Sequence, residues 1–219
     1  MLGCIHEEFG NSLSAHVARF NDGSTEWSLA TMTHALPWQT PKTIALVGLM
    51  GAGKSSIGRR LGQALGLPFV DADSEIEAAA GASIEEIFAR DGEAVFRGGE
   101  RRVISRLLDG SAQVLATGGG AFMDPITRGL IRERAISVWL RADLETLLVR
   151  VGRRNNRPLL KTGDPRAVLT RLIDERYPVY AEADITIDTV DGPPEATLGK
   201  VIAALDRFLA VPVHVEAGP

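Results

Sequence analysis

Residues 48–55 read Gly-Leu-Met-Gly-Ala-Gly-Lys-Ser and match the phosphate-binding pattern G-x-x-x-x-G-K-[ST] in full. The glycines allow backbone N–H groups to curl around phosphate oxygens, and the helix expected next presents its positive N-terminal end. Lys54 would reach the β- and γ-phosphates, and Ser55 would offer its hydroxyl to Mg²⁺. This pattern predicts a nucleoside triphosphate site, and a chance glycine-rich turn is the weaker interpretation.

Two carboxylates, Asp71 and Asp73, follow the short apolar run at 68–70. Residues two apart in extended backbone point the same way, so both carboxylates can face one site. Capping of the following helix by Asp73 would explain only one of the two aspartates. We therefore expect one carboxylate to hold Mg²⁺ through water and the other to meet a substrate hydroxyl.

Residues 96–100 read Phe-Arg-Gly-Gly-Glu, which places Arg97 and Glu100 on one helix face. By itself this pattern favours a solvated ion pair, worth less than about 1 kcal/mol. The two glycines each cost about 1 kcal/mol inside a helix, which indicates close backbone approach or a bend. Three further glycines at 118–120 end another apolar run, and either expose N–H groups to a ligand or form a plain tight turn.

Arginines gather near the polar stretch 152–164, at Arg150, Arg153, Arg154 and Arg157. Such a run is usually a solvated surface, but in a phosphate-binding protein it also fits a mobile lid that brings arginine onto the transferred phosphate. Arg176 is a further candidate for binding an anion.

The composition excludes several classes of protein. The 219 residues are 45% hydrophobic and 24% charged, as in a soluble globular protein with one sizeable core. A net charge of −4 argues against a nucleic-acid partner, since such proteins are usually basic. No apolar run approaches the roughly 20 residues of a membrane span. The start lacks a signal-peptide pattern and Cys4 is the single cysteine, so we expect a cytoplasmic protein.

Residues 42–209 contain neither histidine nor cysteine. If the catalytic core lies there, Ser-His-Asp triads, cysteine nucleophiles, thiolate–zinc sites and histidine-ligated metals are excluded. The chain has four lysines and 20 arginines, and arginine suits planar recognition of phosphate and carboxylate. Chemistry must then come from carboxylates, hydroxyls, lysine, arginine and backbone amides.

Apolar runs that alternate with helical patterns must position these residues. We expect strands at 43–47, 68–71, 113–117, 135–140 and 184–187, and helices at 54–65, 73–80, 83–90, 93–108, 125–134, 144–151, 165–177 and 195–209. Alternation of this kind predicts a five-stranded parallel sheet with helices on both faces. Ligands bind beyond the carboxyl ends of such strands, which here are the loops 48–55, 71–73 and 118–120.

The chain divides into three predicted parts. Residues 1–41 show no sustained period, and we expect a poorly ordered extension in which Met32 is an alternative translation start. Residues 42–210 form the predicted folded domain, and residues 211–219 form a tail.

These motifs, in this order and spacing, resemble the shikimate kinase family over residues 42–209, about three-quarters of the chain. The resemblance implies an α/β P-loop three-layer fold with a five-stranded parallel sheet, similar to the nucleoside-monophosphate kinases, with a mobile lid. It implies transfer of the γ-phosphate of ATP to the 3-hydroxyl of shikimate with Mg²⁺, in chorismate and aromatic amino-acid biosynthesis. It also implies a monomer.

The resemblance assigns roles to individual residues. The implied ATP-binding residues are Gly51, Ala52, Gly53, Lys54, Ser55, Ser56, Arg150 and Arg157, and the implied substrate-binding residues are Asp73, Arg97, Gly119 and Arg176. Ser55 and Asp71 would hold Mg²⁺, partly through water. Lys54, Asp73 and Arg157 would be catalytic, and Glu100 would orient Arg97.

Two other functions fit the phosphate loop. A different small-molecule kinase, such as a gluconate kinase, would share the loop, but the set of Asp73, Arg97, Gly119 and Arg176 suits a ring that bears a carboxylate and adjacent hydroxyls. A nucleotide-binding regulator without catalysis would be expected to have lost Asp71, Asp73 or Arg157, and all three are present. The family often carries Arg or Gln near the adenine, and residues 188–194 have neither.

Overall fold

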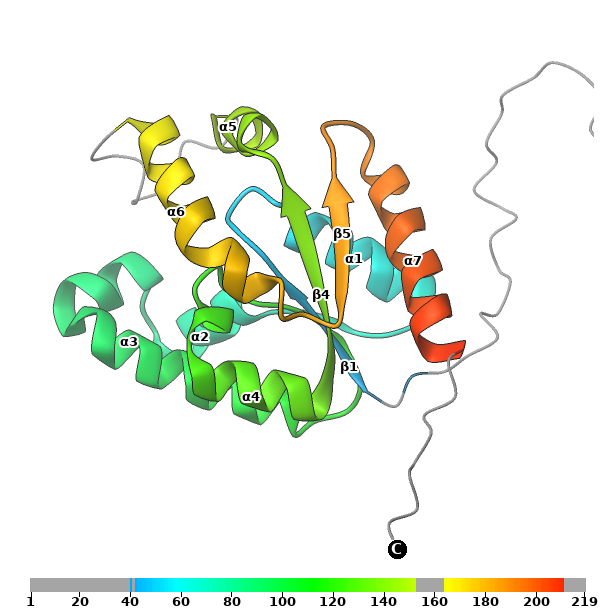
Figure 1. The fold of residues 1–219 in the computed structure, drawn as a ribbon. Helices are drawn as coiled ribbons and strands as arrows, with labels where there is room; N and C mark the ends of the chain where they lie inside the picture. Colours follow the sequence, from blue (N-terminus) through cyan, green and yellow to red (C-terminus); the bar gives the residue numbers. More distant parts are fainter. Residues whose placement is uncertain (1–39, 41, 153–163, 211–219) are drawn as a thin grey trace, which may run out of the picture. The chain divides into compact units, whose positions relative to one another are not determined.

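A computed structural model describes residues 40, 42–152 and 164–210 of the chain (Figure 1). The predicted extension, apart from Thr40, and the predicted C-terminal tail lie outside the described residues. So do most of the polar stretch and Arg153, Arg154 and Arg157, so the lid stays a prediction. Every described residue belongs to the unit 36–219.

Five parallel strands form one sheet in the order β2-β3-β1-β4-β5. Their bounds are β1 (Thr43–Val47), β2 (Phe69–Asp71), β3 (Val114–Ala116), β4 (Ala135–Ala142) and β5 (Ile185–Thr189). The central strand β1 is buried along its whole length, as expected for an apolar run covered by helices on both faces. The predicted five-stranded parallel sheet is therefore confirmed.

Helices cover both faces of this sheet and make three layers (Figure 1). Ile44 and Leu46 face α1 and α7, while Ala45 and Val47 face a second apolar cluster that includes residues of α3, α4 and α6. The bounds are α1 (Lys54–Leu65), α2 (Ala72–Ala80), α3 (Ile84–Leu108), η2 (Ala121–Met123), α4 (Pro125–Arg134), α5 (Leu144–Gly152), α6 (Pro165–Tyr180) and α7 (Pro194–Ala210).

Several predicted element boundaries are wrong. The predicted helices at 83–90 and 93–108 form one element, α3, which bends at Gly92, where the backbone has φ 79° and ψ 171°. The bend therefore lies before Gly98 and Gly99 and not at them. Helix α6 continues past Pro178 to Tyr180, because burial of the Tyr180 ring in the core outweighs the backbone bond that proline removes. Strand β5 begins one residue later than expected and runs on to Thr189.

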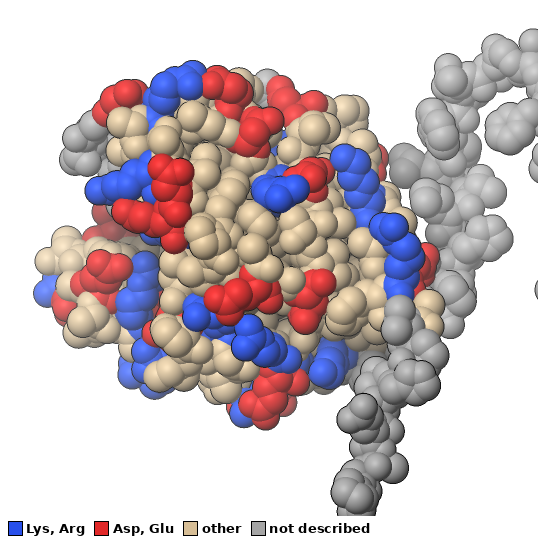
Figure 2. Space-filling view, viewed as in Figure 1, with Lys and Arg blue, Asp and Glu red and all other residues tan. Residues whose placement is uncertain are grey.

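The surface of the described domain carries mixed charge. Figure 2 shows Lys and Arg side chains interspersed with Asp and Glu on the visible face. Among the described helices, none combines the length and the apolar character needed to cross a bilayer.

Candidate active site

The phosphate loop lies between β1 and α1, at the carboxyl end of the central strand (Figure 1). Gly51 has φ 83° and Gly53 has φ 99°, a left-handed conformation that favours glycine. Helix α1 has no acidic residue in its first turn, so its positive end is not neutralised there. The Lys54 ammonium donates to the carbonyl oxygens of Gly48 at 2.8 Å and Leu49 at 3.0 Å. The Lys54 ammonium is thus held against the backbone of the phosphate loop.

Asp71 joins this loop to the end of β2. The Ser55 hydroxyl donates to Asp71 Oδ2 at 2.7 Å, and the Asp73 N–H donates to Asp71 Oδ1 at 3.2 Å. Asp71 therefore caps α2, which begins at Ala72 and makes Asp73 a residue of its first helical turn. The expected extended geometry of 71–73 is wrong, because the helix starts one residue earlier than predicted.

The Asp73 carboxyl is largely withdrawn from solvent. Burial raises its pKa above the ordinary value of 3.8, and the neighbouring Asp71 carboxylate raises it further, against the opposing effect of Lys54. A raised pKa makes the ionised form a better proton acceptor than an exposed aspartate.

Arg97 and Glu100 form the expected pair, with Nη1 and Oε2 2.6 Å apart. The interpretation as a solvated pair is wrong, because Glu100 is only 2% exposed. Burial raises the pKa of the Glu100 carboxyl, and the hydrogen bond from Arg97 acts in the opposite direction. A second carboxylate, Glu93, lies 3.2 Å from Arg97 Nη2 and is exposed. The buried Glu100 carboxylate thus holds the Arg97 guanidinium in place.

Two of the three glycines after β3 make room for charged side chains. A Cβ on Gly118 would lie 2.7 Å from Asp73 Oδ1 and 2.9 Å from Glu100 Oε1. A Cβ on Gly120 would lie 2.5 Å from Arg97 Nη2. At such distances the neighbouring side chain would have to shift, so a tight turn alone does not account for these glycines. They let Asp73, Glu100 and Arg97 approach the backbone.

Gly119 connects this loop to α6. Its carbonyl oxygen accepts from Arg176 Nη1 at 3.0 Å and from the Tyr180 hydroxyl. A Cβ here would meet Met50 N of the phosphate loop at 3.6 Å and Arg176 Nη1 at 3.7 Å, which are ordinary contacts. Gly119 therefore faces the space between the phosphate loop and Arg176.

Arg97 and Arg176 line one cavity of about 340 Å³, although they are far apart in the sequence. Its other lining residues are Glu93, Gly120, Met123, Asp124 and Glu175. Two guanidinium groups facing one small cavity can bind a carboxylate through paired hydrogen bonds. The two guanidinium groups are therefore the cationic part of a lining that also contains the carboxylates of Glu93, Asp124 and Glu175.

Arg150, in α5, contacts both the phosphate loop and the end of β5. Its guanidinium donates to the Ala52 carbonyl at 3.3 Å, to Thr189 Oγ1 at 3.4 Å and to the Val190 carbonyl at 2.5 Å. Arg150 thus ties the phosphate loop to the segment after β5, where no Arg or Gln stands. Ser56 Oγ, in the first turn of α1, accepts from Arg60 Nη1 at 3.1 Å.

Sequence reasoning assigned no role to Tyr180, which contacts Gly119, or to Glu93, which contacts Arg97. Tyr180 follows Arg176 by four residues, the spacing at which two helical side chains share a face. That spacing is the feature of the sequence that could have placed Tyr180 beside Arg176. Glu93 precedes Arg97 by four residues and carried the same signal.

A phosphate loop after β1, two carboxylates at the end of β2 and a cavity lined in part by two arginines define an ATP-dependent phosphotransferase of the P-loop class, acting on a small molecule. Comparison with known proteins gives the family. A family model described as "Shikimate kinase" matches residues 50–206. The chain belongs to the shikimate kinase family.

Individual relatives agree with this assignment. A shikimate kinase of Paramagnetospirillum magneticum is 59% identical over 181 residues, which cover 83% of this chain and 93% of that one. The structure of an Acinetobacter baumannii shikimate kinase in complex with shikimate has a TM-score of 0.73 at 41% identity, over 76% of this chain and 93% of that one. A gluconokinase from Sinorhizobium meliloti, at 20% identity and a TM-score of 0.52, shares the fold alone. The gluconate kinase alternative is therefore set aside.

Proposed function

We propose that this enzyme transfers the γ-phosphate of ATP to the 3-hydroxyl of shikimate, which gives shikimate 3-phosphate and ADP in the synthesis of chorismate and aromatic amino acids. The observation that carries the proposal is the convergence of Lys54, Asp73, Arg97 and Arg176 at the carboxyl edge of one sheet. The Acinetobacter relative, whose structure holds shikimate, supports the substrate.

The nucleotide is held by the phosphate loop in this proposal. Backbone N–H groups of the loop cradle the phosphates, and Lys54 exchanges its two carbonyl partners for phosphate oxygens. Arg150 lies on the nucleotide side, beside the Ala52 carbonyl. The proposed ATP-binding set within the described residues is Gly51, Ala52, Gly53, Lys54, Ser55, Ser56 and Arg150.

Ser55 and Asp71 fit a magnesium ion. Their hydroxyl and carboxylate are hard oxygen ligands that already lie 2.7 Å apart beside the loop. Mg²⁺ is usually held by one or two such groups together with phosphate oxygens and water. When bound, the ion would neutralise charge on the transferring phosphate. Ser55 and Asp71 would fix its position against the loop.

Shikimate is a ring with one carboxylate and several hydroxyls. Arg97 and Arg176 would bind the carboxylate, Gly119 would offer a backbone contact, and Asp73 would bind a ring hydroxyl and accept its proton. Phosphoryl transfer depends on positioning and charge stabilisation, so histidine and cysteine are not needed. This requirement matches a candidate site made of carboxylates, lysine and arginine.

Arg157 is proposed as the arginine that stabilises the transferring phosphate. It lies outside the described residues, and the family resemblance alone supports this role. In related enzymes such an arginine contributes roughly 10³–10⁵-fold in rate. We expect a loss of that order in kcat for Arg157→Ala. Turnover within about tenfold of the parent would contradict the assignment.

The proposal is tested by measuring ADP release from Mg-ATP with and without shikimate. We expect shikimate to stimulate release in the parent protein, Lys54→Ala to abolish the stimulation, and the exposed-lysine control Lys200→Ala to retain it. ATP binding without stimulation by shikimate would contradict the proposed substrate. Equal activity of Lys54→Ala and the control would contradict the proposed site.

We further propose that the enzyme acts as a monomer in the cytoplasm. The resemblance to the shikimate kinase family implies the monomer, and the single cysteine, Cys4, fits a reducing compartment. Light scattering coupled to size exclusion should give one mass near that of one chain. A stable dimer at assay concentration would contradict this.

A further inference from the structure

Tyr180, the last residue of α6, is buried next to the glycine loop 118–120 of the candidate active site. Its side chain is 0% exposed, and its hydroxyl donates to the Gly119 carbonyl oxygen. Burial raises the pKa of Tyr180 to about 12, so the hydroxyl stays protonated throughout the physiological range. It is therefore a permanent donor to the loop that follows β3.

The same carbonyl oxygen accepts a second hydrogen bond, from Arg176 Nη1 at 3.0 Å. Arg176 and Tyr180 are four residues apart on one helix, so both reach the loop from the same face. A guanidinium has five N–H donors in a fixed plane. The bond to Gly119 uses one of them and sets the direction of the guanidinium, which lines the same cavity as Arg97.

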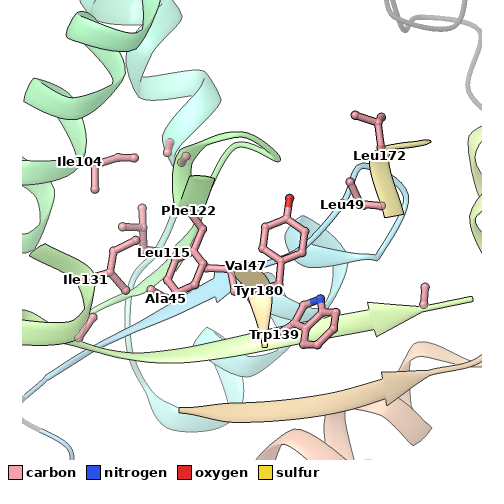
Figure 3. Close-up of a cluster of buried hydrophobic side chains, with 14 of the residues drawn as sticks. Ala45, Val47, Leu49, Ile104, Leu115, Phe122, Ile131, Trp139, Leu172 and Tyr180 are labelled. Carbon is pink, nitrogen blue, oxygen red and sulfur yellow. The ribbon is translucent and has the colours of Figure 1, made fainter. Parts of the chain in front are cut away.

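The Tyr180 ring is held rigidly by other aromatic rings. Its centroid lies 6.4 Å from that of Phe122 and 5.9 Å from that of Trp139. Figure 3 shows Tyr180 between these two rings, with its hydroxyl directed away from the strands. The packing of the ring in the core thus sets the position of the hydroxyl, and a hydroxyl held in this way can orient the groups that it contacts.

We propose that Tyr180 is a positioning residue for substrate binding: its hydroxyl fixes the Gly119 carbonyl, and that carbonyl orients Arg176 toward the carboxylate of the substrate. This inference rests on the proposed function, in which Arg176 binds the shikimate carboxylate. The neighbouring loop residue Gly120 packs against Arg97, so the same peptide lies between both arginines of the cavity.

Tyr177 provides a matched control. It lies in the same helix, its ring contacts Trp139 with centroids 4.9 Å apart, and its hydroxyl also donates to a backbone carbonyl. That carbonyl belongs to Ala142, at the end of β4, and not to the glycine loop. Tyr177→Phe and Tyr180→Phe each remove one hydroxyl from the same aromatic cluster and keep the ring. Only Tyr180→Phe should weaken binding of the substrate.

The test compares steady-state kinetics and Tm of both variants with the parent. We expect Tyr180→Phe to raise KM for shikimate about three- to tenfold, the loss of one positioning hydrogen bond, with KM for ATP unchanged. Tyr177→Phe should leave both KM values within about twofold. A purely structural role would lower Tm in both variants and leave KM for shikimate unchanged, and that result would overturn the inference.

A double-mutant cycle with Arg176→Lys tests whether Tyr180 affects substrate binding through Arg176. If Tyr180 acts through Arg176, adding Tyr180→Phe to Arg176→Lys should raise KM for shikimate less than twofold further. Full additivity would overturn the inference even though the parent enzyme is active. A parent protein without shikimate-dependent ADP release would instead refute the proposed function, and the inference with it.

Discussion

Ser55 Oγ lies 2.7 Å from Asp71 Oδ2, so a hydrogen bond joins the start of α1 to the end of β2. In the proposed function these two oxygens hold Mg²⁺. We expect Asp71→Asn to need about tenfold more free Mg²⁺ for half-maximal activity, because a charged oxygen ligand is replaced by a neutral one. The exposed Asp109→Asn, at the end of α3, is the control. Equal Mg²⁺ requirements in the two variants would contradict the assignment.

Glu100 and Glu93 both contact Arg97, but they differ in burial, and their effects should differ accordingly. We expect Glu100→Gln to raise KM for shikimate about tenfold, because it weakens a buried charge-assisted hydrogen bond that fixes the arginine. Glu93→Gln alters an exposed pair and should change KM by less than about threefold. Steady-state kinetics at saturating ATP distinguish the two. Similar effects would show that burial of Glu100 is not what positions Arg97.

Gly120 and Gly129 give opposite predictions for the same substitution. Gly120→Ala introduces a Cβ 2.5 Å from Arg97 Nη2, so the arginine must move and KM for shikimate should rise about tenfold. Gly129 lies in α4 with nothing within 4 Å of a Cβ, and Gly129→Ala should stabilise the protein by about 0.5–1 kcal/mol without affecting KM. Urea unfolding and steady-state kinetics test both. An unchanged KM in Gly120→Ala would refute the predicted displacement.

The Asp73 carboxyl should make stability depend on pH. Its folded pKa is raised by burial, Asp71 and Glu77, against Lys54 and Arg97, so ionisation on raising the pH costs folding free energy. Stability from this group is fully present below the unfolded pKa of 3.8 and is lost as the pH rises through the folded pKa. Asp73→Asn does not ionise there, and we expect it to unfold at higher urea than the parent at pH 7.

This difference should shrink as the pH falls toward 4, since the parent carboxyl is then protonated. The measurement is urea unfolding in EDTA without nucleotide, so that bound metal does not contribute. A parent protein that is more stable than Asp73→Asn at pH 7 would contradict the raised pKa. The variant should also have lost shikimate-dependent activity.

Most of the fold could be predicted from the sequence because its signals are local. The apolar run at 43–47 forms β1 as predicted, and the helix that starts at Lys54 ends at Leu65, before the left-handed Gly66. Errors arose where long-range packing outweighed a local signal. Pro178 predicts a helix end, but the buried ring of Tyr180 carries α6 onward.

The candidate site was predicted in part, for the same reason. The phosphate loop is contiguous and was assigned from its own residues, and the pairing of Arg97 with Glu100 follows from helical spacing. The burial of Glu100, and the side chains against which Gly118 and Gly120 lie, depend on how α3 docks against α2, α4 and η2. No spacing within one segment encodes that docking.

The sheet order has a consequence for how an unfolded chain regains activity. Ile44 in β1 pairs with Val114 in β3, so the strand before the phosphate loop and the strand before the three glycines meet only after a long chain closure. Closing such a loop costs conformational entropy before the contacts between the two strands can form, and this makes non-local parallel pairing slow. After dilution from denaturant, we expect helical signal to return first, and catalytic turnover to recover with the slowest kinetic phase.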